Sequence, residues 1–580
     1  MMMKYNIINK VKEMFQRHAW NILLPLAGGS GAGILTSCSD FLDIEPRNLV
    51  ILEQFWNEKT DVDNTVAGCY EGLQSASVIT RMMAWGEFRS DNITVGSRAE
   101  QDDLHMYKFL KANIDPSNVY TDWSPMYMVI NRCNTVIHYA PEVQKKDPSF
   151  SESDLRATIA EVSAIRDLCY FYLIRAFKNV PYVTTAYTDD NQPMQLTAMP
   201  FEQVLDSLIT DLENVKDDAV RRYPTEGNKR LYQTGRITKD AIHAMLCEMY
   251  LWKKDYQKCI DYADLVIESK RQTAKEDEGT LYSEMNKYFN GYPLIHEWTS
   301  QTGVYGNAFN EIFGTGNSEE SIFELTFMNN DNMLANGAVN AYYGYMDNGF
   351  YYRVSPASHL VIDIQNNIFS VFRNKFDARY YEAVASSPVI GKYVSTGSVI
   401  EVSTANNVTS GHSYSWAKDK NHSNWIIYRL TDIMLLKAEA LVQMAVDNDD
   451  EKLHEAFDLV QVINKRALLK NKDLITENDL LSFPTDNPKE KMKDLVLLER
   501  QRELLFEGKR WFDLVRCSMR DGNNNVLIEK FKKKGLENSY TIEGQFESTF
   551  DAIFLPCYLE EYKVNKNLWL NPAYTYEEKD

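Results

Sequence analysis

The sequence lacks the short motifs that mark most catalytic and metal sites. Its eight cysteines form no C-x-x-C pair, which argues against zinc-ribbon and thioredoxin-like sites. The nine histidines are scattered, and the His-Glu steps at 296–297 and 454–455 lack the second histidine of an H-E-x-x-H site. No G-x-S-x-G elbow and no phosphate-cradling glycine loop appears. We therefore expect no catalytic site, no metal and no cofactor other than a covalent lipid considered below.

Positive charge is also scarce. Lys and Arg number 62 against 82 Asp and Glu, which gives a formal net charge of −20. Nucleic acid and anionic membrane surfaces are bound through basic patches, so this balance argues against both as partners. The uncharged stretch at 21–37 is interrupted by a proline and four glycines, and it is shorter than the roughly 20 apolar residues that span a bilayer. We expect no permanent membrane helix there.

The start of the chain has the parts of a secretory signal. A basic opening precedes the uncharged stretch, and small residues precede Cys38. The tetrapeptide LTSC at 35–38 resembles a bacterial lipobox, in which the cut falls before a cysteine whose thiol carries a diacylglycerol. Residues 1–37 are therefore predicted to be a lipoprotein signal peptide and Cys38 the lipid attachment site. Two or more acyl chains anchor a protein firmly without a membrane span. An ordinary thiol near a signal cut remains the alternative.

Removing Cys38 leaves an odd number of thiols in the mature chain. The other seven cysteines are Cys69, Cys133, Cys169, Cys247, Cys259, Cys517 and Cys557. At least one must stay free or pair between chains. Because several fall among apolar residues in helical patterns, we expect most of them to be small buried hydrophobes.

Most of the mature chain has helical periodicity. In 240–269, two stretches with apolar residues three and four apart flank the short turn Lys253-Lys254-Asp255. Two amphipathic helices joined in this way form a tetratricopeptide-like pair. A second pair is predicted from 428–444 and 456–467, and further long helices at 53–77, 120–140, 151–178 and 200–215.

The character of the chain changes between 271 and 425, where Gly, Asn, Ser and Tyr increase. The stretch NAYYGYMDNGFYYRV at 340–354 is the most aromatic part. Loops on a rigid scaffold concentrate binding residues, and Tyr and Trp offer large rigid faces on which a sugar ring packs. The predicted ligand-stacking residues are Trp85, Trp298, Tyr305, Tyr342, Tyr343, Tyr345, Tyr351 and Tyr352. Asp91 and Arg353 are predicted to bond to hydroxyl groups.

The segment 495–516 carries three glutamates that suggest enzymatic carboxylates. Glu499, Glu503 and Glu507 are four residues apart, which would place them on one face of a helix. Glycosidases instead need two carboxylates that face each other across a cleft. Three carboxylates on one face repel each other unless cations intervene. We therefore predict a structural charge network, with Arg429 or Glu439 as its partner on the neighbouring helix.

Taken together, these segments resemble the SusD/RagB family of outer-membrane nutrient-binding lipoproteins. The match begins with CSDFLD at 38–43 and ends with Asn571-Pro572-Ala573-Tyr574, where the family has Asn-Pro-Gly-Tyr. Asn179 stands where the family commonly has Gly. The internal segments that carry the resemblance are WGEFRSDN (85–92), WSPMYMVINRCN (123–134), AEVSAIRDLCYFYLIRAFKNVP (160–181), RLTDIMLLKAEAL (429–441) and ERQRELLFEGKRWFDLVR (499–516).

The resemblance implies a mainly α fold with tetratricopeptide-like helix pairs and an irregular, loop-rich ligand-binding half. It implies a lipoprotein on the outer face of the outer membrane that captures glycans and acts as a lid on a SusC-like TonB-dependent transporter. The helix pairs face the transporter, and no catalysis is implied. The chain then divides into the signal peptide, a SusD-like N-terminal helical part (38–270), the aromatic loop region (271–425) and a SusD-like C-terminal part (426–580).

Three other functions remain open from the sequence. A RagB-like protein with the same lid role would capture peptides, and the aromatic loops suit both kinds of ligand. A secreted glycosidase would need opposed carboxylates in a cleft. An assembly scaffold would use the helix pairs to bind protein alone.

Overall fold

The computed structural model describes residues 55–189, 191–224, 231–277, 289–295, 304–327, 335–344, 352–363, 371–385, 388–403, 407–414, 422–469 and 476–576. Residues Trp56–Asp580 form one compact unit, and the description below concerns that unit. The predicted signal peptide, Cys38, Trp298, Tyr345 and Tyr351 lie outside the described residues.

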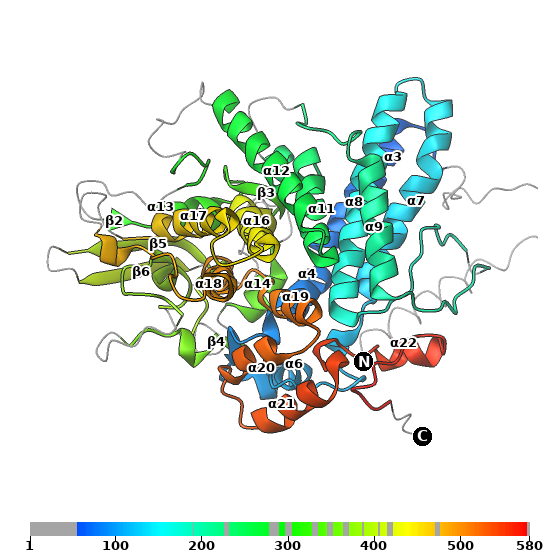
Figure 1. The fold of residues 1–580 in the computed structure, drawn as a ribbon. Helices are drawn as coiled ribbons and strands as arrows, with labels where there is room; N and C mark the ends of the chain where they lie inside the picture. Colours follow the sequence, from blue (N-terminus) through cyan, green and yellow to red (C-terminus); the bar gives the residue numbers. More distant parts are fainter. Residues whose placement is uncertain are drawn as a thin grey trace, which may run out of the picture. The chain divides into compact units, whose positions relative to one another are not determined.

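Long helices packed in succession form the scaffold (Figure 1). Each long helix contacts the next long helix along the chain. The contact between α12 and α16 joins the first helices to the last pair, although the loop-rich region separates them in sequence. These long helices are α3 (Lys59–Gln74), α7 (Ser124–Lys146), α8 (Glu152–Phe177), α9 (Phe201–Val215), α11 (Lys239–Lys253), α12 (Tyr256–Asp277), α16 (Leu430–Met444) and α17 (Glu451–Arg466). The predicted mainly α fold is confirmed.

Local sequence fixes where these helices begin and end. Ser151 and Asp154 form a capping box at the start of α8. The Thr238 side chain accepts a hydrogen bond from the Ala241 N–H at the start of α11. Lys254, with a φ of 67°, ends α11 in a left-handed turn that leads directly into α12. The predicted pair at 240–269 is therefore present, whereas the helix predicted over 53–77 is broken at Ser75, the N-cap of α4 (Ala76–Met83).

Three small antiparallel sheets lie mainly within the loop-rich region. β1 (Ile93–Val95) pairs with β4 (Val354–Pro356), and β3 (Ser321–Leu325) pairs with β7 (Trp425–Arg429). β5 (Ser395–Val402) lies between β2 (Val304–Tyr305) and β6 (Val408–Tyr414). The β1–β4 pair joins residues more than 250 positions apart in sequence, which brings the segment after WGEFRSDN against the end of the aromatic stretch.

The remaining helices complete the described unit. Those before α17 are the π-helix η2 (Ala84–Phe88), α5 (Ala99–Asp102), α6 (Leu104–Leu110), η3 (Val119–Thr121), α10 (Leu231–Thr234), α13 (Asn307–Phe309), η5 (Asn310–Thr315), α14 (Gly337–Tyr342), η6 (Ser358–Leu360) and α15 (Ala378–Ala383). Those after it are η8 (Glu477–Asp479), α18 (Pro488–Glu503), α19 (Arg510–Asp521), α20 (Asn525–Lys532), α21 (Ser539–Ser548), η9 (Phe550–Ile553) and α22 (Leu559–Val564).

A tight turn separates α18 from α19. The prediction that Glu499, Glu503 and Glu507 share one helical face is therefore wrong for Glu507. The helix ends at Glu503, so Glu507 lies in the turn rather than one further helical step along the same face. Phe506 and Gly508 have φ angles of 66° and 73°, which reverse the chain. A side chain at 508 would also come within 2.9 Å of the Trp425 ring, so only glycine fits this close approach.

The helical core buries the described thiols. All seven described cysteines are free and buried, which confirms that they act as small core residues.

Among the described helices, none is both long and apolar enough to cross a membrane.

Candidate functional site

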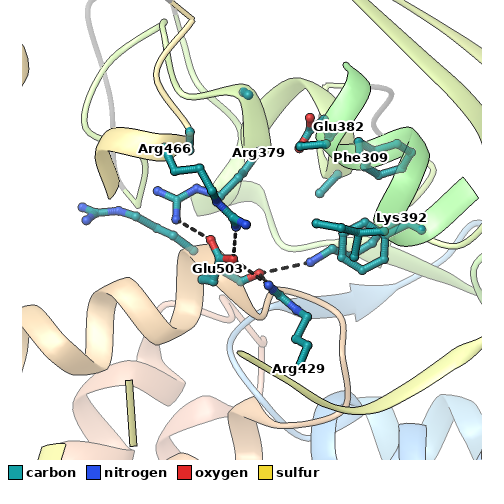
Figure 2. Close-up of a pocket in the computed structure, with 14 residues that line it drawn as sticks. Phe309, Arg379, Glu382, Lys392, Arg429, Arg466 and Glu503 are labelled. Atoms are coloured by element: carbon teal, nitrogen blue, oxygen red, sulfur yellow. Dashed lines mark hydrogen bonds and ion pairs between the residues drawn. The ribbon is translucent and has the colours of Figure 1, made fainter. Parts of the chain in front are cut away.

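Glu503 and Glu507 lie at the centre of a buried charge network with Arg379, Lys392, Arg429 and Arg466. Figure 2 shows Glu503 among its four cationic neighbours. Arg429 donates from Nη1 to Glu503 at 2.7 Å and from Nη2 to Glu507 at 2.7 Å. Lys392 Nζ donates to Glu507 at 2.7 Å, and Arg466 donates to Glu503. We call these six residues the charge network.

Electrostatics in the charge network favours ionised carboxylates. Burial disfavours the charge on Glu503, but Arg466, Arg429 and Arg379 outweigh it and hold the pKa of Glu503 well below its usual range. The cavity beside these residues has a volume of about 40 Å³. That space suits buried water rather than a sugar, because ligand pockets typically run to several hundred Å³. The network is structural.

The predicted partners of the glutamate segment are both confirmed. Arg429 binds Glu503 and Glu507, as described above. Glu439 of α16 accepts a hydrogen bond from Arg516 Nη2 at 2.6 Å. These carboxylates lie in ion pairs between packed elements, which is not the opposed arrangement across an open cleft that a glycosidase needs. Among the described residues, no cluster of His, Cys, Asp and Glu could hold a metal ion.

Two predicted ligand residues, Trp85 and Asp91, lie in the core. The Trp85 indole is fully buried, its Nε1 donates to the Tyr120 carbonyl at 2.8 Å, and the Phe177 ring packs edge-on at 5.1 Å. Asp91 is 1% exposed and accepts two hydrogen bonds from Arg510, at 2.8 and 3.0 Å. Neither side chain has a surface open to a ligand, so their predicted contact with a sugar is corrected to a packing role.

Tyr343 and Tyr305 are also buried. The Tyr343 hydroxyl donates to the Phe506 carbonyl at 3.0 Å, which fastens α14 to the turn after α18. Tyr305 is 5% exposed within β2, which pairs with β5. Burial leaves neither ring a free face, and the expectation of stacking is corrected for both.

The Tyr342 ring lies under the Arg353 side chain, near the end of the aromatic stretch. Its hydroxyl lies 2.7 Å from that of Tyr120, which in turn donates to Asp103. The guanidinium of Arg353 sits over the Tyr342 ring at 5.6 Å and donates to the Ala341 carbonyl at 3.2 Å. Tyr342 is only 7% exposed, so it supports Arg353 rather than offering its own face.

Tyr352 and Arg353 are half-buried, whereas the other described members of the predicted site are buried. The Gly96 N–H donates to the Arg353 carbonyl at 2.9 Å, and the Arg98 N–H to the Tyr352 carbonyl at 3.5 Å. A side chain at 96 would come within 2.3 Å of the Tyr352 oxygen, so glycine permits this approach. Arg98, Tyr352 and Arg353 together are called the rim.

Arg98 is the rim residue that sequence reasoning missed. Its side chain is 37% exposed and pairs with Asp102 at 3.1 Å. Nothing in the local sequence marks it, because it reaches the site only through the pairing of β1 with β4. The rim offers one aromatic ring and two guanidinium groups at the surface, which is chemistry suited to a hydroxyl-rich ligand.

A second surface feature is an apolar groove of about 680 Å³ between α7, the segment 181–196 and α22. Its exposed apolar side chains include Met128, Met194 and Val564, which are 58%, 54% and 66% exposed. Asn131 of α7 donates to the Tyr187 carbonyl at 2.9 Å, which fastens the wall of the groove. Apolar surfaces of this kind mark contacts with other molecules.

Comparison with known proteins covers nearly the whole chain. A model described as "SusD family" matches residues 252–574, and one described as "Starch-binding associating with outer membrane" matches residues 40–251. The chain belongs to the SusD family. The first model alone spans more than half of the chain, and the second begins directly after Cys38 and Ser39.

Individual relatives agree with this assignment. A SusD-like protein of Formosa agariphila is 24% identical over 537 residues, covering 84% of this chain and 89% of the relative. A SusD-like protein of Bacteroides ovatus is 23% identical over 500 residues, covering 83% and 80%. A SusD superfamily structure from Bacteroides vulgatus superposes with a TM-score of 0.61 at 17% identity, covering 90% and 100%. The SusD-like fold is therefore established.

Proposed function

We propose that this SusD-family protein is a cell-surface lipoprotein that binds an extracellular glycan and delivers it to a SusC-like TonB-dependent transporter. The observation that carries this proposal is the match of two family models from residue 40 to residue 574. The name of the first-half model includes both starch binding and association with the outer membrane. The protein acts as a binding protein rather than an enzyme.

The rim supports the glycan part of the proposal. The face of a pyranose ring packs on Tyr352, and its hydroxyl groups accept hydrogen bonds from Arg98 and Arg353. The hydrogen bond between the Tyr120 and Tyr342 hydroxyl groups fixes the Tyr342 ring, and Arg353 packs over that ring. Arg353 is therefore held in place before the ligand arrives, which lowers the entropy cost of binding. Trp298, Tyr345 and Tyr351 remain predicted stacking residues of this site.

The lipid on Cys38 provides the anchor in this proposal. Attachment through the first residue of the mature chain leaves the compact unit free to face the cell exterior. The apolar groove supports the transporter part, because α7 and α8 form one of the helix pairs that the resemblance assigns to the transporter. We place the contact at Met128, Met194 and Val564, which would otherwise expose apolar surface to water.

Affinity electrophoresis tests glycan binding. Residues 39–580 are run through native gels that contain single polysaccharides, with serum albumin as a marker that binds none of them. Retardation by one polymer supports the proposal and identifies the ligand class. A folded protein that no polymer retards, but that binds a peptide mixture, would contradict it in favour of peptide capture.

A further inference from the structure

Two buried cysteines meet inside the helix pair α11–α12. Cys247 lies on α11 and Cys259 on α12, and their sulfur atoms are 3.7 Å apart. Both residues are fully buried. Only the left-handed turn at Lys254 and a few helical residues separate them along the chain. The short connection keeps the two sulfurs facing each other whenever the pair is folded.

This geometry is close to that of a disulfide. A disulfide needs its two Cα atoms within about 7 Å and its two Cβ atoms directed toward each other. Sulfur atoms in van der Waals contact between adjacent helices meet the second condition, and a sulfur shift of about 1.7 Å would bring them to the bonded distance near 2.0 Å. The remaining cysteines on other helices provide internal comparisons, including Cys169 on α8 and Cys517 on α19.

We propose that Cys247 and Cys259 form a disulfide in the exported protein, which would be a covalent clasp between the two helices of the pair. This proposal rests on the proposed export, because disulfides persist in oxidising compartments outside the cytosol. The two thiols lose two protons and two electrons as the sulfur–sulfur bond forms. The electron acceptor is the disulfide of an exported thiol–disulfide oxidoreductase, which is reduced to its dithiol.

Burial determines when the bond can form. Burial and the neighbouring Cys259 raise the pKa of the Cys247 thiol well above its usual range, so the folded pair contains almost no attacking thiolate. Oxidation therefore occurs while α11 and α12 are still open, and the closed pair then protects the bond. Protein that folds in a reducing compartment keeps both thiols and oxidises slowly afterwards.

Peptide mapping of the full chain, exported with its own leader, tests the proposal. Free thiols are alkylated with N-ethylmaleimide in denaturant before trypsin digestion. Cleavage after lysine places Cys247 in peptide 240–253 and Cys259 in peptide 259–270. We expect these two peptides as one linked species that separates on reduction. Recovery of both as alkylated single peptides, or a link from either cysteine to Cys69, Cys133 or Cys169, would overturn the proposal.

A thermal measurement provides the second test. Adding a reductant during refolding should lower the midpoint of wild-type unfolding by about 3 °C, because a short-loop disulfide is lost from a large domain. Cys247→Ala and Cys259→Ala should each abolish this reductant effect, whereas Cys517→Ser should retain it. An equal reductant effect in all three variants would overturn the proposal. These readouts do not involve glycan, so they separate this inference from a failure of glycan binding.

Discussion

The charge network and the rim both contain arginine guanidinium groups, but the two regions differ in burial and in the groups that the arginines contact. In the charge network, Arg429 is 1% exposed and contacts the carboxylates of two glutamates. In the rim, Arg353 is half-buried, lies over the Tyr342 ring and donates to one backbone carbonyl. Arg429 also lies over the Phe313 ring, 5.8 Å from its centre, so an arginine beside an aromatic ring is no indication of a ligand site by itself. Burial and the number of carboxylates already bound distinguish the two roles.

The comparison also has an energetic side. Removing one partner of a buried ion pair strongly destabilises the folded protein, because the other charge is left without compensation. A half-exposed arginine can regain water when its partner is lost, so the same change costs little. Mutations in the two regions should therefore separate stability from binding.

The largest effect is expected at the centre of the charge network. Arg429→Ala removes the guanidinium group that binds both Glu503 and Glu507, which keep only their other partners, and should lower the free energy of unfolding by about 3–5 kcal/mol. Denaturant unfolding followed by circular dichroism measures the change. Arg156→Ala is the matched control, because Arg156 is 49% exposed and its pairs should contribute about 0–1 kcal/mol. Equal losses in the two variants would contradict the distinction between the regions.

A smaller effect is expected for the acid stability of a neighbouring buried pair. Burial would raise the pKa of Asp432, but Lys509 and Arg500 outweigh it and lower the pKa to about 2. The unfolded carboxyl has a pKa near 3.9, so the unfolded state binds more protons between about pH 4 and pH 2. Stability should therefore fall as the pH drops through this window, by about 2–3 kcal/mol from Asp432.

Asp432→Asn should remove that part of the acid dependence. The variant will be less stable at pH 7, but its free energy of unfolding should change less between pH 4 and pH 2 than that of the wild type. Urea unfolding at a series of pH values provides the comparison. An acid profile parallel to that of the wild type would show that Asp432 does not titrate as the structure implies.

At the rim, we expect binding to change while stability stays constant. Arg98→Ala removes one hydrogen-bond donor to the glycan and should weaken binding by about 1 kcal/mol, roughly fivefold. Its free energy of unfolding should stay within about 0.5 kcal/mol of the wild type, because the side chain is partly exposed. Isothermal calorimetry with the retarding glycan measures the affinity. Tyr540→Ala, which removes an 87% exposed aromatic ring from α21, should leave binding unchanged.

The smallest effect on the isolated protein is expected in the apolar groove. Met128→Glu combined with Val564→Glu should leave both stability and glycan affinity nearly unchanged, since both side chains are more than half exposed. The same double variant should lose co-purification with the proposed SusC-like transporter. Retained co-purification would move the transporter contact away from this groove.

Sequence periodicity predicted the helical scaffold well because helix pairs are local structures. The turn between α11 and α12 follows from residues 253–255, and the partners Arg429 and Glu439 follow from charge balance along one segment. The end of α18 could not be predicted, since the turn after it depends on positive φ angles at Phe506 and Gly508 and on the close approach of Gly508 to Trp425.

The candidate site was harder to predict because it depends on distant contacts. Trp85 and Asp91 have the residue types of a sugar site, yet Tyr120 and Arg510 hold them in the core. Arg98 reaches the rim only because Gly96 allows the chain to approach Tyr352. Neither the burial of the first two nor the exposure of the third is encoded in a local pattern. Tyr352 and Arg353 were predicted because they end the aromatic stretch.

The most direct test of the central claim is the glycan affinity of a rim variant that keeps the charge network intact. Tyr352→Ala combined with Arg353→Ala removes the stacking face and one guanidinium group. In affinity gels with the polysaccharide that retards the wild type, we predict at least a tenfold loss of affinity, about 1.4 kcal/mol, with an unchanged unfolding midpoint. Wild-type retardation by this folded variant would contradict the claim that the rim binds the glycan.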